Sequence, residues 1–199
     1  WVALYDPSKP GATVGSFKTG TSYADSVRAV AVGAGNTVYV AGYMGVLATA
    51  TDNRDAWFAR LDPKLLLWWE ITDGAGRHDS GEALVLRPDG HFYAAGYRTD
   101  GGSTVGPCLW TLRSDGVIRD KDQTGMTVTD GFRALTTASN GDLLAWGFRA
   151  AQGPVPPKTR LVRASAWGQL TCSAASKCQA LSWKDCDDGK PCTFNDCNS

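Results

Sequence analysis

One pattern of short apolar runs recurs along the chain, and this repeat limits the possible folds more than any other feature. Three copies cover residues 25–43, 79–97 and 130–148. Each copy begins with Asp, has Ala four residues later and ends on Gly before an aromatic residue; the landmarks are Asp25, Ala29 and Gly42, Asp79, Ala83 and Gly96, and Asp130, Ala134 and Gly147. The period, about 51 to 56 residues, is the scale of blade repeats in β-propellers.

Each copy contains two apolar runs bounded by Gly, Asp, Asn or Pro. Runs of this kind, rich in Val, Leu, Tyr and Trp, predict β-strands closed by turns. A third run follows each copy, at 57–63, 109–113 and 160–164, and a fourth is visible at 65–71, 117–119 and 169–171. Four strands in about fifty residues is the anatomy of a propeller blade. The sequence therefore predicts an all-β fold of β-propeller-type, four-stranded blades.

The repeats define the expected domains. We expect blades over residues 1–171, with repeats near 22–76, 77–127 and 128–171 and a partial blade over 1–21, because residues 1–7 match the third run at 57–63. About three and a half blades are fewer than the four to eight of closed propellers. Since unpaired strand edges recruit other strands, we expect the chain to be part of a larger propeller or assembly.

Composition changes after Leu170, where cysteines become dense. The repeats contain only Cys108, whereas the tail over 172–199 contains Cys172, Cys178, Cys186, Cys192 and Cys197. This density predicts a disulfide-rich tail and an oxidising compartment, so an extracellular or cell-surface location. Zinc is a weaker explanation, because the spacings include no Cys-x-x-Cys pair and no nearby His. Five is an odd number, and the pairing stays open.

Oxygen-bearing side chains lie between these cysteines. Asp187, Asp188, Asn195 and Asp196 are candidate calcium ligands, since calcium prefers oxygen donors. Their spacing does not fit an EF-hand loop, and Asp and Asn also cap turns with their side-chain oxygens. Calcium is the one cofactor that the sequence suggests, and turn capping is the simpler reading.

Two segments resemble known families. Asn36-Thr-Val-Tyr-Val-Ala-Gly-Tyr43, followed by Asp55-Ala-Trp-Phe-Ala-Arg-Leu-Asp-Pro63, is similar to the bacterial β-propeller repeat of the SBBP type, found in secreted and surface proteins. Cys186-Asp-Asp-Gly-Lys-Pro-Cys-Thr-Phe-Asn-Asp-Cys197 resembles the short extracellular cysteine repeat of slime-mould matrix proteins and of surface proteins of myxobacteria-like bacteria. Both resemblances imply an exported, modular protein, and neither implies a reaction.

The remaining composition excludes some function classes. Lys and Arg number 20, as do Asp and Glu, so no overall positive field favours nucleic acid. No apolar run is long enough to span a membrane.

The two histidines, His78 and His91, lie apart in the sequence. His78 with Ser80 is the sole local pair of a nucleophile and a base. A turn at the blade entrance explains both residues more simply, so we assign no catalytic residue.

Aromatic side chains give the binding candidates. Trp68 and Trp69 are adjacent on an expected outer strand, so one of them should point outward. An exposed Trp is a contact candidate for a protein partner, ahead of carbohydrate. The repeated Asp25, Asp79 and Asp130 could line a cation-binding ring, but a repeated Asp more often closes the same turn in every repeat.

The sequence thus predicts a non-catalytic extracellular or cell-surface module for binding, adhesion or structural assembly. Its partner is expected to be a protein, or further copies that complete the blade set. The alternative is a propeller-scaffold enzyme acting on polysaccharide, a lyase or a glycoside hydrolase. That chemistry needs paired carboxylates, which Asp25, Asp79, Asp130 or Glu82 would have to supply.

Overall fold

The computed structural model describes residues 2–9, 11–46, 53–74, 78–87, 90–99, 105–123, 131–149 and 158–164. Within these ranges the regular structure consists of β-strands and one short 3-10 turn, Ala34–Asn36. The predicted all-β class is confirmed. The cysteine-rich tail, with its candidate calcium ligands and Cys172, Cys178, Cys186, Cys192 and Cys197, lies outside the described residues.

The strands form four sheets, numbered here in chain order. Sheet 1 contains β1 (Val2–Tyr5) and β2 (Thr13–Phe17). Sheet 2 contains β3 (Ser26–Val32), β4 (Val38–Gly45), β5 (Arg54–Leu61) and β6 (Leu67–Asp73). Sheet 3 contains β7 (Ser80–Leu86), β8 (Phe92–Thr99), β9 (Val105–Leu112) and β10 (Ile118–Gln123). Sheet 4 contains β11 (Gly131–Thr137), β12 (Leu143–Arg149) and β13 (Lys158–Ala164).

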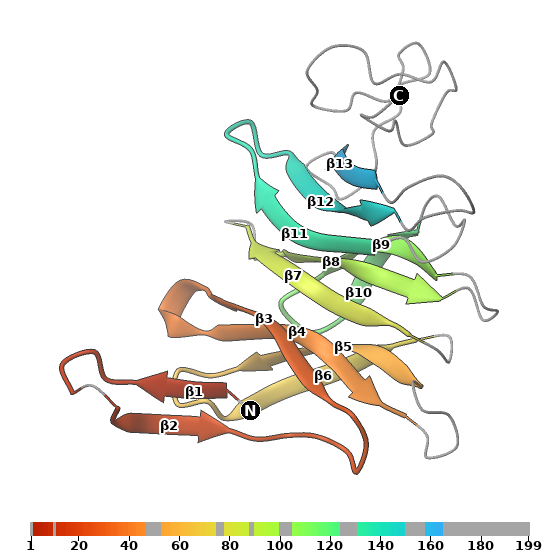
Figure 1. The fold of residues 1–199 in the computed structure, drawn as a ribbon. Helices are drawn as coiled ribbons and strands as arrows, with labels where there is room; N and C mark the ends of the chain where they lie inside the picture. The colour runs from red at the N-terminus through yellow and green to blue at the C-terminus, as the bar shows by residue number, and fades with distance from the viewer. Residues whose placement is uncertain are drawn as a thin grey trace, which may run out of the picture.

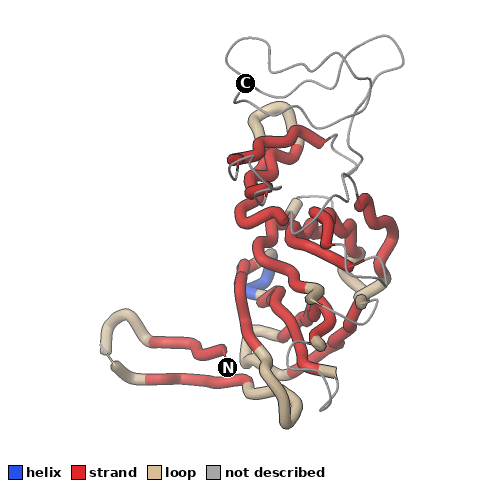
Figure 2. Tube along the Cα trace, turned by 45° about the vertical axis from the view of Figure 1, so that its right-hand side comes forward, coloured by secondary structure: helices blue, strands red, loops and turns tan. Residues whose placement is uncertain are grey.

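Every sheet is antiparallel, and within each sheet each strand pairs with the next one in the chain. The predicted four-stranded antiparallel unit is therefore confirmed for sheets 2 and 3. The sheets stack in chain order, with the first strands β3, β7 and β11 next to one another (Figure 1). The β1–β2 hairpin projects from one end of this row (Figure 2).

Aromatic rings fill the space between sheets 2 and 3. Tyr39 of β4 contacts Phe92 of β8 with 5.1 Å between ring centroids. Phe58 of β5 contacts Trp110 of β9 at 5.3 Å. All four rings belong to one buried cluster, which also includes Cys108. Tilted ring pairs of this kind stabilise a core beyond their buried area, so this cluster is the main joint between the two complete sheets.

The same packing recurs at the other two joints. Between sheets 3 and 4 the buried cluster consists of Tyr93, Ala95, Leu109, Phe132, Leu143 and Ala145. Between sheets 1 and 2, Val2 and Phe17 pack on a cluster that includes Trp57, Leu61 and Leu65. Each complete sheet is therefore apolar on both faces, which explains why the alternation of polar and apolar residues in the sequence is only partial.

The repeated glycines have one structural cause. In β3, β7 and β11 the register shifts by one residue beside Gly42, Gly96 and Gly147, so each first strand contains a β-bulge. The bulge brings a backbone carbonyl over the glycine of the second strand. A Cβ at Gly42 would overlap the carbonyl oxygen of Ser26, and a Cβ at Gly96 would overlap that of Ser80. Only glycine fits at these positions, because the obstacle is backbone.

Replacing one of these glycines is expected to destabilise the protein. Gly96→Ala should lower the free energy of unfolding by about 3 kcal/mol, the upper part of the range for overpacking. Gly15→Ala is the matched control, because a Cβ there meets its nearest atoms at 3.8 Å, an ordinary contact. Chemical denaturation of both variants tests this. A Gly96→Ala variant as stable as Gly15→Ala would contradict the structural role of the bulge.

Candidate functional site

The three bulges place three charged side chains in one line. The extra residue of each bulge is Arg28 in β3, Glu82 in β7 and Arg133 in β11. A bulge re-aims the side chain of its extra residue and often lies beside a functional site. Because the three strands are neighbours in the row of sheets, the three side chains meet.

Glu82 lies at the centre of this line. Its Oε2 accepts a hydrogen bond from Nη1 of Arg133 at 2.6 Å. Its Oε1 accepts one from the Ser80 hydroxyl at 2.7 Å and lies 3.8 Å from Nε of Arg28. The Glu82 side chain is 7% exposed, whereas Arg28 and Arg133 are 42% and 40% exposed. The carboxylate is therefore held inside, and the two guanidinium groups reach solvent.

Aromatic rings alternate with arginines along the same line. We call this set the arginine ladder: Arg28, Tyr43, Arg54, Tyr97, Arg133 and Phe148. The Tyr43 ring lies 5.3 Å from the guanidinium carbon of Arg28 and 4.5 Å from that of Arg54. Cation–π contacts at such distances stabilise the charged form of arginine at a partly buried site.

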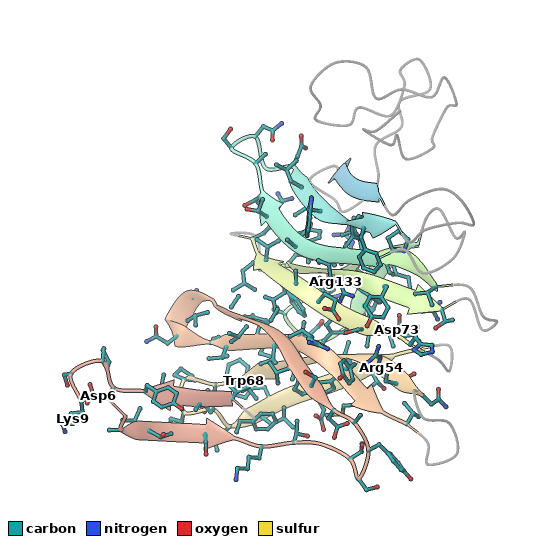
Figure 3. All side chains as sticks on the ribbon, in the orientation of Figure 1. Asp6, Lys9, Arg54, Trp68, Asp73 and Arg133 are labelled. Atoms are coloured by element: carbon teal, nitrogen blue, oxygen red, sulfur yellow. The ribbon has the colours of Figure 1, made fainter. Side chains whose placement is uncertain are left out.

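The second half of the ladder repeats this arrangement. Arg133 lies 5.3 Å from the centroid of Tyr97 and 5.0 Å from that of Phe148. Arg54 lies 5.9 Å from the Tyr97 ring and donates from Nη2 to the Tyr97 hydroxyl at 3.0 Å. Arg54 and Arg133 are labelled in Figure 3. Burial raises the pKa of Tyr97, although the charges of Arg54 and Arg133 oppose that rise, so the hydroxyl stays neutral and can accept from Arg54.

The repeated aspartates tie strand ends together. Asp25 accepts hydrogen bonds from the backbone N–H of Thr21 at 2.6 Å and of Gly45 at 2.9 Å. Asp79 accepts from the backbone N–H and, at 2.7 Å, from the hydroxyl of Thr99. In both repeats the Asp thus binds the residue twenty positions later, at the end of the second strand. Asp130 lies outside the described residues.

A second ionic cluster joins sheets 2 and 3. Asp73, labelled in Figure 3, accepts from Trp110 Nε1 at 2.8 Å and Lys121 Nζ at 2.9 Å, and it lies 3.3 Å from Nε of Arg98. Burial raises the pKa of Asp73, but these hydrogen bonds and positive charges outweigh burial and hold the pKa below its ordinary value. Asp55 differs: burial and the negative charges of Asp79 and Asp73 raise its pKa, although Arg98 opposes this.

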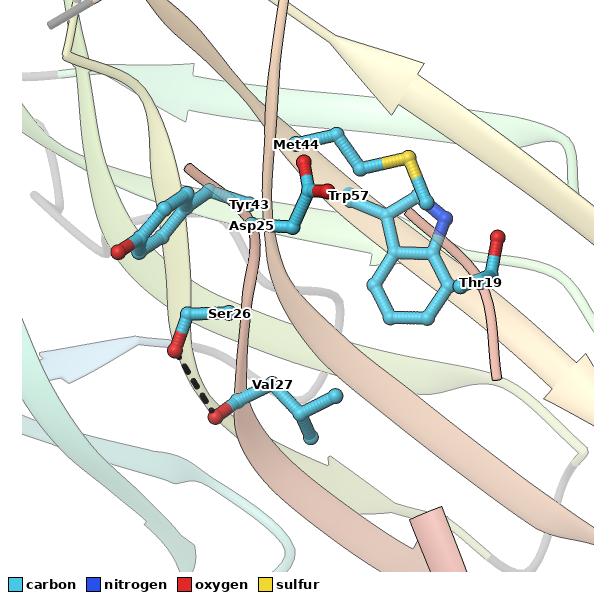
Figure 4. Close-up of a pocket in the computed structure, with 7 residues that line it drawn as sticks. All are labelled: Thr19, Asp25, Ser26, Val27, Tyr43, Met44 and Trp57. Carbon is cyan, nitrogen blue, oxygen red and sulfur yellow. Dashed lines mark hydrogen bonds between the residues drawn. The ribbon is translucent and has the colours of Figure 1, made fainter. Parts of the chain in front are cut away.

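A small pocket opens beside the ladder. It has a volume of about 120 Å³ and is lined by Thr19, Asp25, Ser26, Val27, Tyr43, Met44 and Trp57 (Figure 4). Trp57 is one of its walls and donates from Nε1 to Glu70 at 3.1 Å. Pockets that hold drug-sized ligands have volumes of about 300 Å³ or more, so this pocket by itself suits only a small group.

The two adjacent tryptophans point in different directions. Trp69 lies inside, where its ring stacks on Phe92 and its Nε1 donates to the Ser114 carbonyl at 2.9 Å. Trp68 is the extra residue of a bulge in β6 and is exposed, with the Arg60 guanidinium 4.0 Å from its ring centroid. Trp68 is therefore the outward member of the pair, and whether it binds a partner stays a prediction.

The residues considered for catalysis are engaged in other contacts. Ser80 donates its hydroxyl to Glu82 at 2.7 Å. Of the carboxylates that the polysaccharide enzyme would need, Asp25 and Asp79 bind strand ends, and Glu82 binds arginine. In the described part of the chain, no three His, Cys, Asp or Glu side chains are grouped to hold a metal ion. No helix in that part could span a membrane.

Comparison with known proteins adds no relative. No family model matches the chain, and no curated protein matches it. The functional reading therefore rests on the residues themselves.

The sequence did contain a signal for the arginine ladder. The aligned repeats have Arg28, Glu82 and Arg133 at one position, and an aromatic residue after each landmark glycine. What the alignment lacks is Arg54, which comes from a third strand and enters the ladder only because sheets 2 and 3 stack. The informative pattern was a side chain whose charge alternates from repeat to repeat at one aligned position, rather than an identical residue in every repeat.

Two substitutions at the ionic cluster have opposite expected effects. At pH 7, Asp55→Asn should raise the unfolding temperature, because it removes a charge that the fold disfavours. Asp73→Asn should lower the free energy of unfolding by about 2 kcal/mol, since a buried charged acceptor is lost. A carboxyl group whose pKa is higher in the folded protein than in the unfolded chain, as at Asp55, contributes stability that is lost as pH rises through the folded pKa. A carboxyl group whose pKa is lower in the folded protein, as at Asp73, contributes stability that is lost as pH falls through the folded pKa.

Thermal unfolding of both variants between pH 7 and pH 2 tests these signs. The gain in unfolding temperature of Asp55→Asn should vanish below about pH 3.9, the ordinary pKa of Asp. At such pH the Asp55 carboxyl of the native sequence is protonated in both the folded and the unfolded state. The loss in Asp73→Asn should shrink only at lower pH. Effects of the same sign at pH 7 would contradict the charge distribution of the cluster.

Proposed function

We propose that the protein is a non-catalytic binding and assembly module built from β-propeller blades, exported to the cell surface or beyond, in which sheet 1 is half of a blade. A first and second strand from another copy of the repeat complete it. The observation that carries this proposal is the exposure of Val30 and Val32 on β3, at 57% and 63%. Its export is supported by the cysteine density of the tail and by the resemblance to repeats of surface proteins.

Sheet 3 contains the positions that correspond to Val30 and Val32, and the burial of the side chains can be compared between the two sheets. Leu84 and Leu86 occupy in β7 the places that Val30 and Val32 occupy in β3. Both leucines are partly buried against the cluster between sheets 2 and 3. Valines at the same positions in sheet 2 are exposed because the hairpin of sheet 1 packs over Trp57 and Leu61 of the third strand β5 and leaves β3 uncovered.

The strands that would cover Val30 and Val32 can be specified from the strand order of the repeat. Sheet 1 consists of a pair that matches the third and fourth strands of a repeat, and in the described part of the chain β1 pairs only with β2. A first and second strand placed against the free edge of β1 would continue the sheet and lie over Val30 and Val32. Such strand addition uses backbone hydrogen bonds and a shared apolar face.

The opposite end of the row supports the same conclusion. Trp146 is exposed on the face of sheet 4 that points away from the cluster with sheet 3. The row thus has apolar residues uncovered at both ends. Because the two end faces differ, copies of the chain that meet through these faces, without exchanging strands, associate head to tail, and such contacts form rings or filaments.

The test is the mass of the isolated 199-residue chain in solution. We expect it to associate with increasing concentration to multiples of its 21.2 kDa mass. A Val30→Arg, Val32→Arg double variant should stay at the mass of one chain with an unchanged β-sheet circular dichroism spectrum. Val117→Arg is the matched control, an equally accessible turn residue away from both end faces, and it should still associate. A monomeric native chain, or equal association of both variants, would contradict the proposal.

A further inference from the structure

We propose that the exposed edge of the arginine ladder binds a small dicarboxylate. The proposal does not depend on the assembly proposed above. The site would give the module a soluble ligand, recognised by the N–H edges of Arg28, Arg54 and Arg133.

The charge of the ladder is unbalanced. Three guanidinium groups belong to it, and Glu82 is the one carboxylate that contacts any of them among the described residues. The whole chain has equal numbers of basic and acidic residues, so three guanidinium groups in contact with one carboxylate form a local excess of positive charge that the net charge does not reveal. Two carboxylates would neutralise it.

The ladder also has unused hydrogen-bond donors. A guanidinium has five N–H groups and no acceptor. The Tyr43 ring lies 4.5 Å from the guanidinium carbon of Arg54, and one N–H of its Nη2 is used by the Tyr97 hydroxyl, so the remaining N–H groups of Arg54 are the donors that a ligand could use. The Nε of Arg54 is buried and has no hydrogen-bond acceptor within the described ranges. Since an unsatisfied buried donor is costly, a ligand oxygen at this point would be stabilised.

Glu82 shows that a carboxylate fits the geometry. Each of its oxygens faces a different arginine, at 2.6 Å from Arg133 and 3.8 Å from Arg28. These two side chains are about two-fifths exposed, so a ligand can approach them from solvent. Carboxylates match the forked donors of arginine, because one carboxylate can accept two parallel hydrogen bonds from one guanidinium.

A purely structural ladder is the competing explanation. Arginine and aromatic residues could simply join sheets 2, 3 and 4 through stacking and through Glu82. In that case loss of an arginine would lower stability but would not change the response to any anion. The two explanations therefore differ in ligand binding and in the effect of removing Glu82.

The probe is malonate, added to the 199-residue chain at constant ionic strength and followed by calorimetry and by thermal unfolding. We expect one malonate per chain with a dissociation constant of about 1 mM or lower. Arg28→Gln and Arg133→Gln should each weaken binding at least about tenfold, as expected for a charge-assisted hydrogen bond. Arg113→Gln is the control: this arginine pairs with Asp115 outside the ladder, and its loss should leave binding unchanged.

Glu82→Gln gives the opposite expected result. Without the resident carboxylate, malonate should bind at least about tenfold more tightly, because the excess charge rises by one. If the glutamine variants of the arginines do not fold, Arg28→Lys and Arg133→Lys keep the charge, and each should still weaken binding because the forked donors are lost. No malonate binding by the native chain, equal binding of sulfate, or unchanged binding in the ladder variants would overturn the proposal.

Discussion

The close approach of a backbone carbonyl to Gly42, Gly96 and Gly147 is the constraint on which the other features depend. Without a side chain at these positions, the first strand of each sheet can bulge against the second. The bulge then determines which way the next charged side chain points. One repeated glycine in the sequence therefore controls both the strand pairing and the position of Arg28, Glu82 and Arg133.

Stacking of sheets that are apolar on both faces has a consequence for the ends of the row. A sheet whose two faces are both apolar needs a neighbour on each side. Sheet 3 has both neighbours, whereas the inner part of sheet 2 has one, and this explains why Val30 and Val32 are exposed while Leu84 and Leu86 are covered. The strand pair that we propose would supply the neighbour that this part of sheet 2 lacks.

The all-β class and the four-stranded antiparallel unit could be predicted from the sequence, because strand and turn signals are local and recur in each repeat. The bulges could not, since a glycine inside a strand can mark a bulge, a tight bend or a close backbone approach, and the repeated glycines alone do not distinguish these. The arginine ladder was only half visible: its aligned members share a repeat position, but Arg54 reaches Tyr97 across two sheets. Contacts between repeats depend on stacking, which the spacing of residues within one repeat does not determine.

The claim that β1 is an inner strand of the working protein has one direct test, amide hydrogen exchange along Val2–Tyr5. An antiparallel strand with a single partner protects every second amide, and a strand between two partners protects successive amides. We predict slow exchange at consecutive residues of β1 in the native assembly. Fast exchange at every second residue would mean that β1 is a true edge and would contradict the account of sheet 1 as half of a blade.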